Sequence, residues 1–174
     1  ELSSGKKVIE YEEVVVSSNT MTFEEYIDLR NLAFIIFVTN QGIVFDAVQK
    51  LLREQDIDVF ELYYRMLTNK KNSPENTQKV IEQFKQATIG ELWDSPQELL
   101  ENFQKDSEYK KLLNGEAGTN VLYHYKAVVI SEYMDDWTEH VIETAHMVIK
   151  NSNNYNDELE NQFESVANYC KGLS

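Results

Sequence analysis

The chain has one cysteine, two prolines and six glycines among its 174 residues. A single cysteine, Cys170, rules out an internal disulfide framework and a cysteine-based zinc site, and it fits a reducing compartment. So few prolines and glycines argue against a disordered chain or a loop-rich β fold. The fully apolar run at residues 32–38 is far shorter than the roughly 20 residues that a membrane helix needs. We therefore expect a soluble, cytoplasmic protein with no membrane partner.

Basic residues are also scarce. The sequence has 16 lysines and arginines against 30 aspartates and glutamates, a formal net charge of −14. Phosphate binding requires a basic surface, so this balance argues against nucleic acid as a partner. The one local basic cluster, Lys70 and Lys71, is expected in a solvated loop. The sequence also has no phosphate loop, dinucleotide fingerprint, nucleophile elbow or zinc-finger spacing.

What the sequence does contain is helical periodicity, and it is clearest from residue 22 to residue 42. Thr22 and Glu25 have the spacing of a capping box, and apolar residues then recur at helical intervals. No polar face remains across residues 32–38, and a helix that is apolar all round is buried by other elements. Gly42 lies where a C-terminal cap would fall. This segment is predicted to be the central helix of a helical domain.

Helical periodicity and start signals continue along the rest of the chain. In the helix that opens at Asp58, the side chains expected to be buried are Phe60, Tyr63, Tyr64 and Leu67. Residues 119–150 form one long helix or two that meet near Asp135 and Asp136. The predicted fold class is all-α, an irregular bundle of about eight helices with one N-terminal strand or extended arm. Residues 1–20 are the tail and connecting strand, and residues 21–174 are the helical domain.

Residues 8–17, VIEYEEVVVS, are the one good strand candidate in the chain. They are rich in β-branched residues and alternate in part. A lone strand cannot satisfy its own backbone, so it needs a partner from a subunit or from another part of a longer protein. The alternative is an extended arm packed on the helices, and both interpretations stay open. The chain begins with glutamate rather than methionine, as expected of a processed protein or an excised fragment.

The first candidate for chemistry is Glu143-x-x-His146, with His140 three residues before Glu143. Glu and His at this spacing share a helix face, as in carboxylate-bridged di-metal bundles. Such sites need a second motif of the same kind and further glutamates, and no second Glu-x-x-His occurs in the sequence. Solvated polar residues beside the apolar stripe are therefore the default interpretation, and no metal is assigned.

Two further groups have side chains suited to chemistry. His124, between two tyrosines, could face a substrate or act as an acid–base group, but without a placed carboxylate partner the favoured interpretation is a partly exposed structural histidine. Asp135 and Asp136, with Glu132 and Glu139, could do acid–base or metal work, but in so acidic a chain a charged helix face explains them as well. Cys170 lies on the buried side of an amphipathic helix, where an inert small hydrophobe is expected. No catalytic residue is assigned.

Residues 12–42 read EEVVVSSNTMTFEEYIDLRNLAFIIFVTNQG. This run resembles a segment of radical S-adenosylmethionine proteins that carry an N-terminal cobalamin-binding domain. In those proteins a strand ending in Val-Val-x-Ser/Thr leads to a short Thr/Ser-Met/Leu-Thr/Ser turn, an acidic-aromatic helix opening, a long apolar helix and a glycine turn. The matching parts here, in that order, are residues 14–18, 20–22, 24–26, 32–38 and Gly42.

In that family the segment lies downstream of the radical barrel and begins a helical C-terminal region. The resemblance therefore implies a C-terminal accessory domain of a cobalamin-dependent radical S-adenosylmethionine enzyme. The iron–sulfur cluster, S-adenosylmethionine and cobalamin would be bound by the parent, upstream of this chain, which lacks the Cys-x-x-x-Cys-x-x-Cys motif. The fragment itself would be inert, with no catalytic or cofactor-binding residue, and its partner would be the missing N-terminal part of the same protein.

Two other hypotheses come from the residues alone. A stand-alone acidic helical module that binds a protein partner would explain the net charge and the lack of a recognisable active site. A small helical metalloenzyme would use His140, Glu143 and His146. The substrate, the reaction and the oligomeric state are left open by the sequence.

Overall fold

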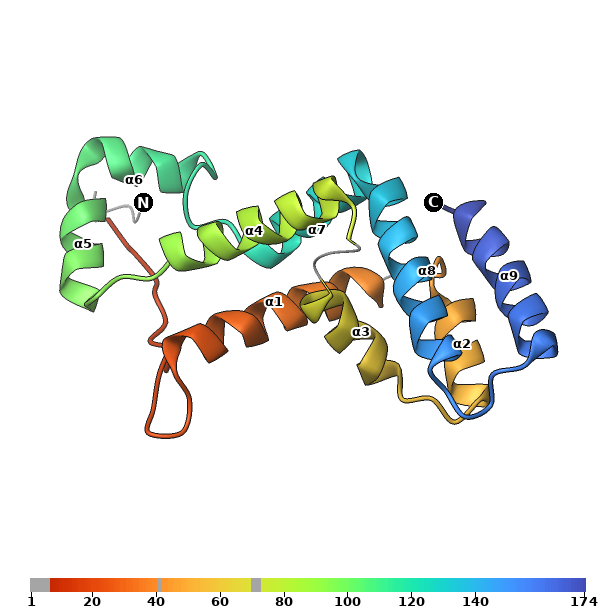
Figure 1. Ribbon diagram of the computed structural model, residues 1–174. Helices are drawn as coiled ribbons and strands as arrows, with labels where there is room; N and C mark the ends of the chain where they lie inside the picture. Colours follow the sequence, from red (N-terminus) through yellow and green to blue (C-terminus); the bar gives the residue numbers. More distant parts are fainter. Residues whose placement is uncertain (1–6, 41, 70–72) are drawn as a thin grey trace.

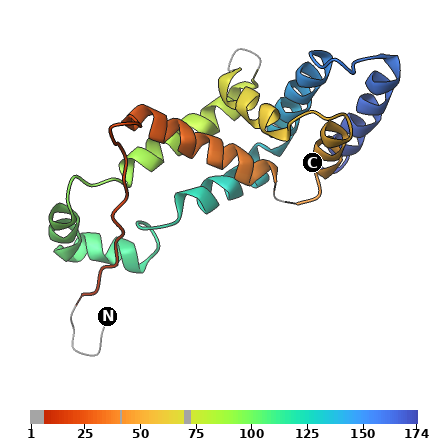
Figure 2. The same ribbon diagram turned by 90° about the horizontal axis from the view of Figure 1, so that it is seen from below.

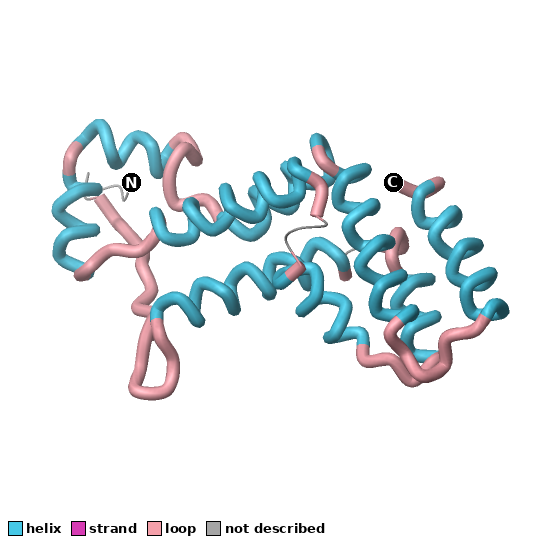
Figure 3. Tube along the Cα trace, viewed as in Figure 1, coloured by secondary structure: helices cyan, strands magenta, loops and turns pink. Residues whose placement is uncertain are grey.

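The computed structural model describes residues 7–40, 42–69 and 73–174, which form nine α-helices and no strand. The all-α prediction is confirmed (Figures 1 and 3). Lys70, Lys71 and the first six residues of the expected tail lie outside the described residues. The helices are α1 (Phe23–Thr39), α2 (Asp46–Glu54), α3 (Val59–Thr68), α4 (Glu75–Gly90), α5 (Pro96–Gln104), α6 (Asp106–Leu113), α7 (Val121–Glu132), α8 (Met134–Lys150) and α9 (Asp157–Lys171).

The helices form an elongated body with three parts (Figures 1 and 2). In the middle, α1 packs against α3, α4 and α7. At one end, α8 and α9 pack together with α2. At the other end, α5 and α6 form a small hairpin that packs mainly on itself. Across the three described ranges, no helix combines the length and the apolar character needed to cross a membrane.

The central helix α1 begins at the predicted capping box. The Thr22 hydroxyl accepts a hydrogen bond from the Glu25 backbone N–H at 3.2 Å, and the Glu25 carboxylate accepts one from the Thr22 N–H at 2.7 Å. The Thr22 hydroxyl also donates to the Glu25 carboxylate at 3.0 Å, and the two hydrogen bonds that this carboxylate accepts hold the pKa of Glu25 below its usual value. Asn40, rather than Gly42, is the C-cap of α1. Gly42 instead turns the chain toward α2 with φ at 98°, a region that favours glycine.

An aromatic cluster forms the centre of the core. The ring of Phe34 on α1 stacks on that of Phe84 on α4, with the centroids 4.4 Å apart. Trp137 on α8 meets Phe34 edge to face at 5.7 Å and donates from Nε1 to Thr39 Oγ1 at 3.3 Å. All three rings are fully buried. The cluster thus joins three helices that are distant in sequence.

The segment 119–150 is two helices rather than one. Tyr133 separates α7 from α8 with φ −132° and ψ 20°, outside the helical region. The break lies two residues before Asp135, close to the position at which two helices were expected to meet. It lets α7 pack on α4 while α8 packs on α3 and α9.

The buried face of α3 differs from the prediction. Phe60 and Tyr64 are 49% and 47% exposed, and the buried side chains are Leu62, Tyr63 and Met66. Apolar residues surround most of this short helix, so its periodicity does not identify one face. The face is selected mainly by α1 and α8, against which α3 packs most extensively.

Residues 8–17 form an extended arm and not a strand. At the arm's start, Lys7 Nζ contacts Asp106 Oδ1 at 2.6 Å and the Gln104 carbonyl oxygen, and it lies over the Tyr109 ring. At the arm's other end, an isolated bridge joins Ser18 to Met21 just before α1. Between these anchors, residues 9–17 make no backbone hydrogen bond to any part of the chain that the structure describes.

Candidate functional site

The three candidate metal ligands on α8, His140, Glu143 and His146, lie in different environments. His140 is 1% exposed, and its Nε2 lies 3.1 Å from the carbonyl oxygen of Met66. The default interpretation of solvated residues is therefore wrong for His140. Because α8 packs against α3, α4 and α9, more of its circumference is buried than the apolar stripe indicates.

His146 is half-buried between α8 and α9. Its Nε2 lies 2.8 Å and 3.0 Å from the two carboxylate oxygens of Glu160, and its ring stacks on Phe163 at 4.8 Å. Although partial desolvation opposes it, hydrogen bonding from His146 and Tyr155 leaves the pKa of Glu160 below its usual value. The contacts of His146 with Glu160 and Phe163 therefore help to pack α9 on α8.

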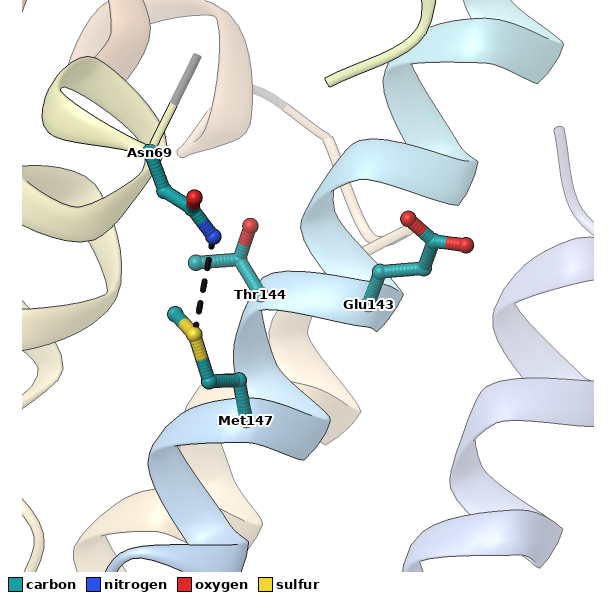
Figure 4. A pocket seen from close by; sticks show the side chains of 4 residues that line it. All are labelled: Asn69, Glu143, Thr144 and Met147. Atoms are coloured by element: carbon teal, nitrogen blue, oxygen red, sulfur yellow. Dashed lines mark hydrogen bonds between the residues drawn. The ribbon is translucent and has the colours of Figure 1, made fainter. Parts of the chain in front are cut away.

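Glu143 is exposed and lines a shallow pocket of about 400 Å³ with Asn69, Thr144 and Met147 (Figure 4). Figure 4 shows the Glu143 carboxylate turned away from Asn69, whose Nδ2 donates to Met147 Sδ at 3.5 Å. Among the residues that the structure describes, no three His, Cys, Asp or Glu side chains are grouped to hold a metal ion. His140, Glu143 and His146 are therefore not brought together.

The other candidates lie on the surface or in packing contacts. His124 is exposed and meets the neighbouring Tyr125 ring edge to face. Asp136 accepts a hydrogen bond from Asn76 Nδ2 at 2.7 Å, while Asp135 faces solvent. Cys170 is fully buried, as predicted, and burial raises the pKa of its thiol. Within the described ranges, none of the carboxylates, histidines or Cys170 belongs to a group of three that could hold a metal ion.

A groove of about 780 Å³ lies between α1, α3 and α4. Its volume is in the range of binding pockets, which span about 300–1,000 Å³. We call it the α1–α3–α4 groove. Its lining residues come from the turn before α1 and from the three helices: Thr20, Met21, Glu25, Asp28, Leu29, Asn31, Leu32, Tyr64, Leu67, Thr68, Ile81, Glu82 and Lys85.

The extended arm, residues 8–17, is a second surface that could bind a partner, because it exposes apolar side chains. Its exposed apolar side chains are Val8, Tyr11, Val14 and Val15, and Val15 is 72% exposed. Their β-branched or aromatic character suits a pleated, half-buried strand. The β-branched composition of residues 8–17 is the sequence signal for this feature.

The groove had no such signal in the sequence. Leu29, Leu67 and Ile81 come from three helices, and each fits an ordinary apolar stripe. The exposure of Leu29 and Tyr64, at 55% and 47%, follows only from how the helices are arranged.

The chain matches no family model, no curated protein and no solved structure. The resemblance of residues 12–42 to cobalamin-binding radical S-adenosylmethionine proteins therefore stays a prediction.

Proposed function

We propose that this chain is the helical accessory domain of a cobalamin-dependent radical S-adenosylmethionine enzyme, docked through its extended arm onto a sheet of the parent. The observation that carries the proposal is the arm. It has strand composition, is held at both ends, and lacks a backbone partner within the described ranges. It also leads into the capped apolar helix α1, in the same order as the family segment that it resembles.

An exposed extended segment can act as a binding element because its backbone donors and acceptors are free to exchange water for the backbone of another chain. It does so by adding to the free edge of a sheet. The Lys7 contact with Asp106 ties the start of the arm to α6, and the Ser18–Met21 turn joins its end to α1. Both restrict the arm and reduce the entropy lost on pairing. The partner in this proposal is the N-terminal part of the same protein.

The cofactors of the parent would be bound outside this chain. The residues here do not fit an iron–sulfur cluster, because the sequence has one cysteine and that thiol is fully buried. The helical domain would instead cover the open end of the barrel or help to shape the substrate pocket. A reduced, buried Cys170 agrees with a cytoplasmic location.

The test is to sequence the source gene upstream of Glu1 and to purify the complete product. An open frame that carries a Cys-x-x-x-Cys-x-x-Cys motif is expected, together with iron, sulfide and cobalamin bound to the purified parent. A product that binds neither an iron–sulfur cluster nor cobalamin would rule the proposal out.

The α1–α3–α4 groove favours a second candidate function, an acidic helical module that binds a protein partner. An amphipathic helix that lays its apolar face into a groove is a recurrent mode of peptide recognition. Leu29, Leu67 and Ile81 offer apolar contacts on all three sides of the groove.

Selection of displayed helical peptides on the purified chain tests this second candidate. We expect enriched peptides whose affinity falls at least about tenfold in Leu29→Glu, because a charge would replace an apolar contact. Ile130→Glu is the matched control, since Ile130 is 54% exposed, much as Leu29 is, but lies outside the groove. Equal binding to both variants, or no enrichment, would contradict it.

A further inference from the structure

The α1–α3–α4 groove has a surplus of negative charge. Its lining contains three carboxylates, Glu25, Asp28 and Glu82, and one ammonium group, Lys85. Hydrogen bonds to Thr22 keep the Glu25 carboxylate ionised, with its pKa below the usual value. Asp28 forms no ion pair with any residue that the structure describes. The groove therefore favours a cationic ligand.

A buried acceptor lies in the same lining. Asn31 is 5% exposed, and its Oδ1 has no hydrogen-bond partner in the described part of the chain. Buried polar atoms without partners are uncommon in folded proteins. Asn31 follows Asp28 by three residues on α1, so the two side chains are neighbours on one helix surface. Because Asn31 also lines the groove, a turn of its side chain would present the buried amide oxygen to an N–H donor that enters the groove beside Asp28.

We propose that the groove binds a cationic amphipathic helix, one of whose lysine or arginine side chains donates a hydrogen bond to Asn31 Oδ1. Apolar residues of that helix pack on Leu29, Leu67 and Ile81. Lysine and arginine fit because their side chains carry donors and no acceptor. The inference rests on the second candidate function and names the chemistry of its partner.

The first test uses peptides enriched by selection, measured by fluorescence anisotropy. Asn31→Leu keeps the number and branching of the side-chain heavy atoms and removes the acceptor, and we expect it to weaken binding at least about tenfold. Replacing the peptide's basic residue with norleucine should abolish the difference between wild type and variant. Asp28→Asn, an exposed change that leaves packing intact, should weaken binding in the same direction. Peptides enriched without a basic residue, or unchanged affinity in Asn31→Leu, would overturn the inference while leaving the second candidate function standing.

The second test needs no peptide. In a titration with n-butylguanidinium chloride followed by NMR, the Asn31 side-chain amide and the Asp28 backbone amide are expected to shift. Neutral n-butylurea should shift them less, and the Asp28 shift should be lost in Asn31→Leu. Equal responses to the charged and neutral compounds would overturn the cation site.

Discussion

Replacing Trp137 with alanine is expected to lower the free energy of unfolding by about 3–5 kcal/mol, the usual loss when a large buried aromatic residue is truncated. Trp137 is fully buried, contacts Phe34 edge to face and donates to Thr39. Its loss would open a cavity where α1, α4 and α8 meet. Since domains are stable by about 5–15 kcal/mol in total, the variant should be near the limit of folding.

Urea denaturation monitored by circular dichroism provides the measurement, and the other tryptophan provides the control. Trp93 is 36% exposed and meets Phe103 edge to face. Trp93→Ala should cost at most about 2 kcal/mol, because much less apolar surface is removed from the core. Losses of equal size in the two variants would show that the aromatic cluster is not the centre of the core.

Acidification below about pH 6.5 is expected to destabilise the fold through His140. The Met66 carbonyl can only accept, so His140 Nε2 carries the proton and Nδ1 is unprotonated. Nδ1 is buried without a partner in the described residues, and burial holds the pKa of His140 below its usual value. As pH falls through the unfolded-state pKa, near 6.5, the unfolded chain takes up a proton that the folded chain does not. Stability then falls by up to about 1.4 kcal/mol per pH unit until the folded-state pKa is reached.

The measurement is the free energy of unfolding from urea titrations at a series of pH values between 7 and the onset of carboxylate protonation. His140→Leu should reduce this slope, because it removes the titrating group. Parallel pH curves for wild type and His140→Leu would contradict the assignment.

The helix starts could be predicted because capping is local. Thr22 caps α1 and Asp58 caps α3, each through a hydrogen bond to a residue two or three positions away. Such bonds depend only on nearby sequence. The break at Tyr133 has no proline or glycine to mark it, so the sequence left one helix or two as alternatives.

Faces and sites could not be predicted in the same way because they depend on packing between distant segments. The surroundings of His140 are set by Met66, which precedes it by 74 residues. The groove likewise forms only when α1, α3 and α4 come together. The periodicity of the sequence also does not show whether the side-chain amide of Asn31 has a hydrogen-bond partner.

Hydrogen exchange at the backbone amides of residues 9–17 tests the central claim most directly. In the 174-residue chain these amides should exchange at the rate of an unstructured peptide, because they form no backbone hydrogen bond to the described residues. In the complete parent protein they should exchange at least about 100-fold more slowly, since the arm would be paired with a sheet. Fast exchange in the parent would contradict docking through the arm, and with it the proposed accessory role.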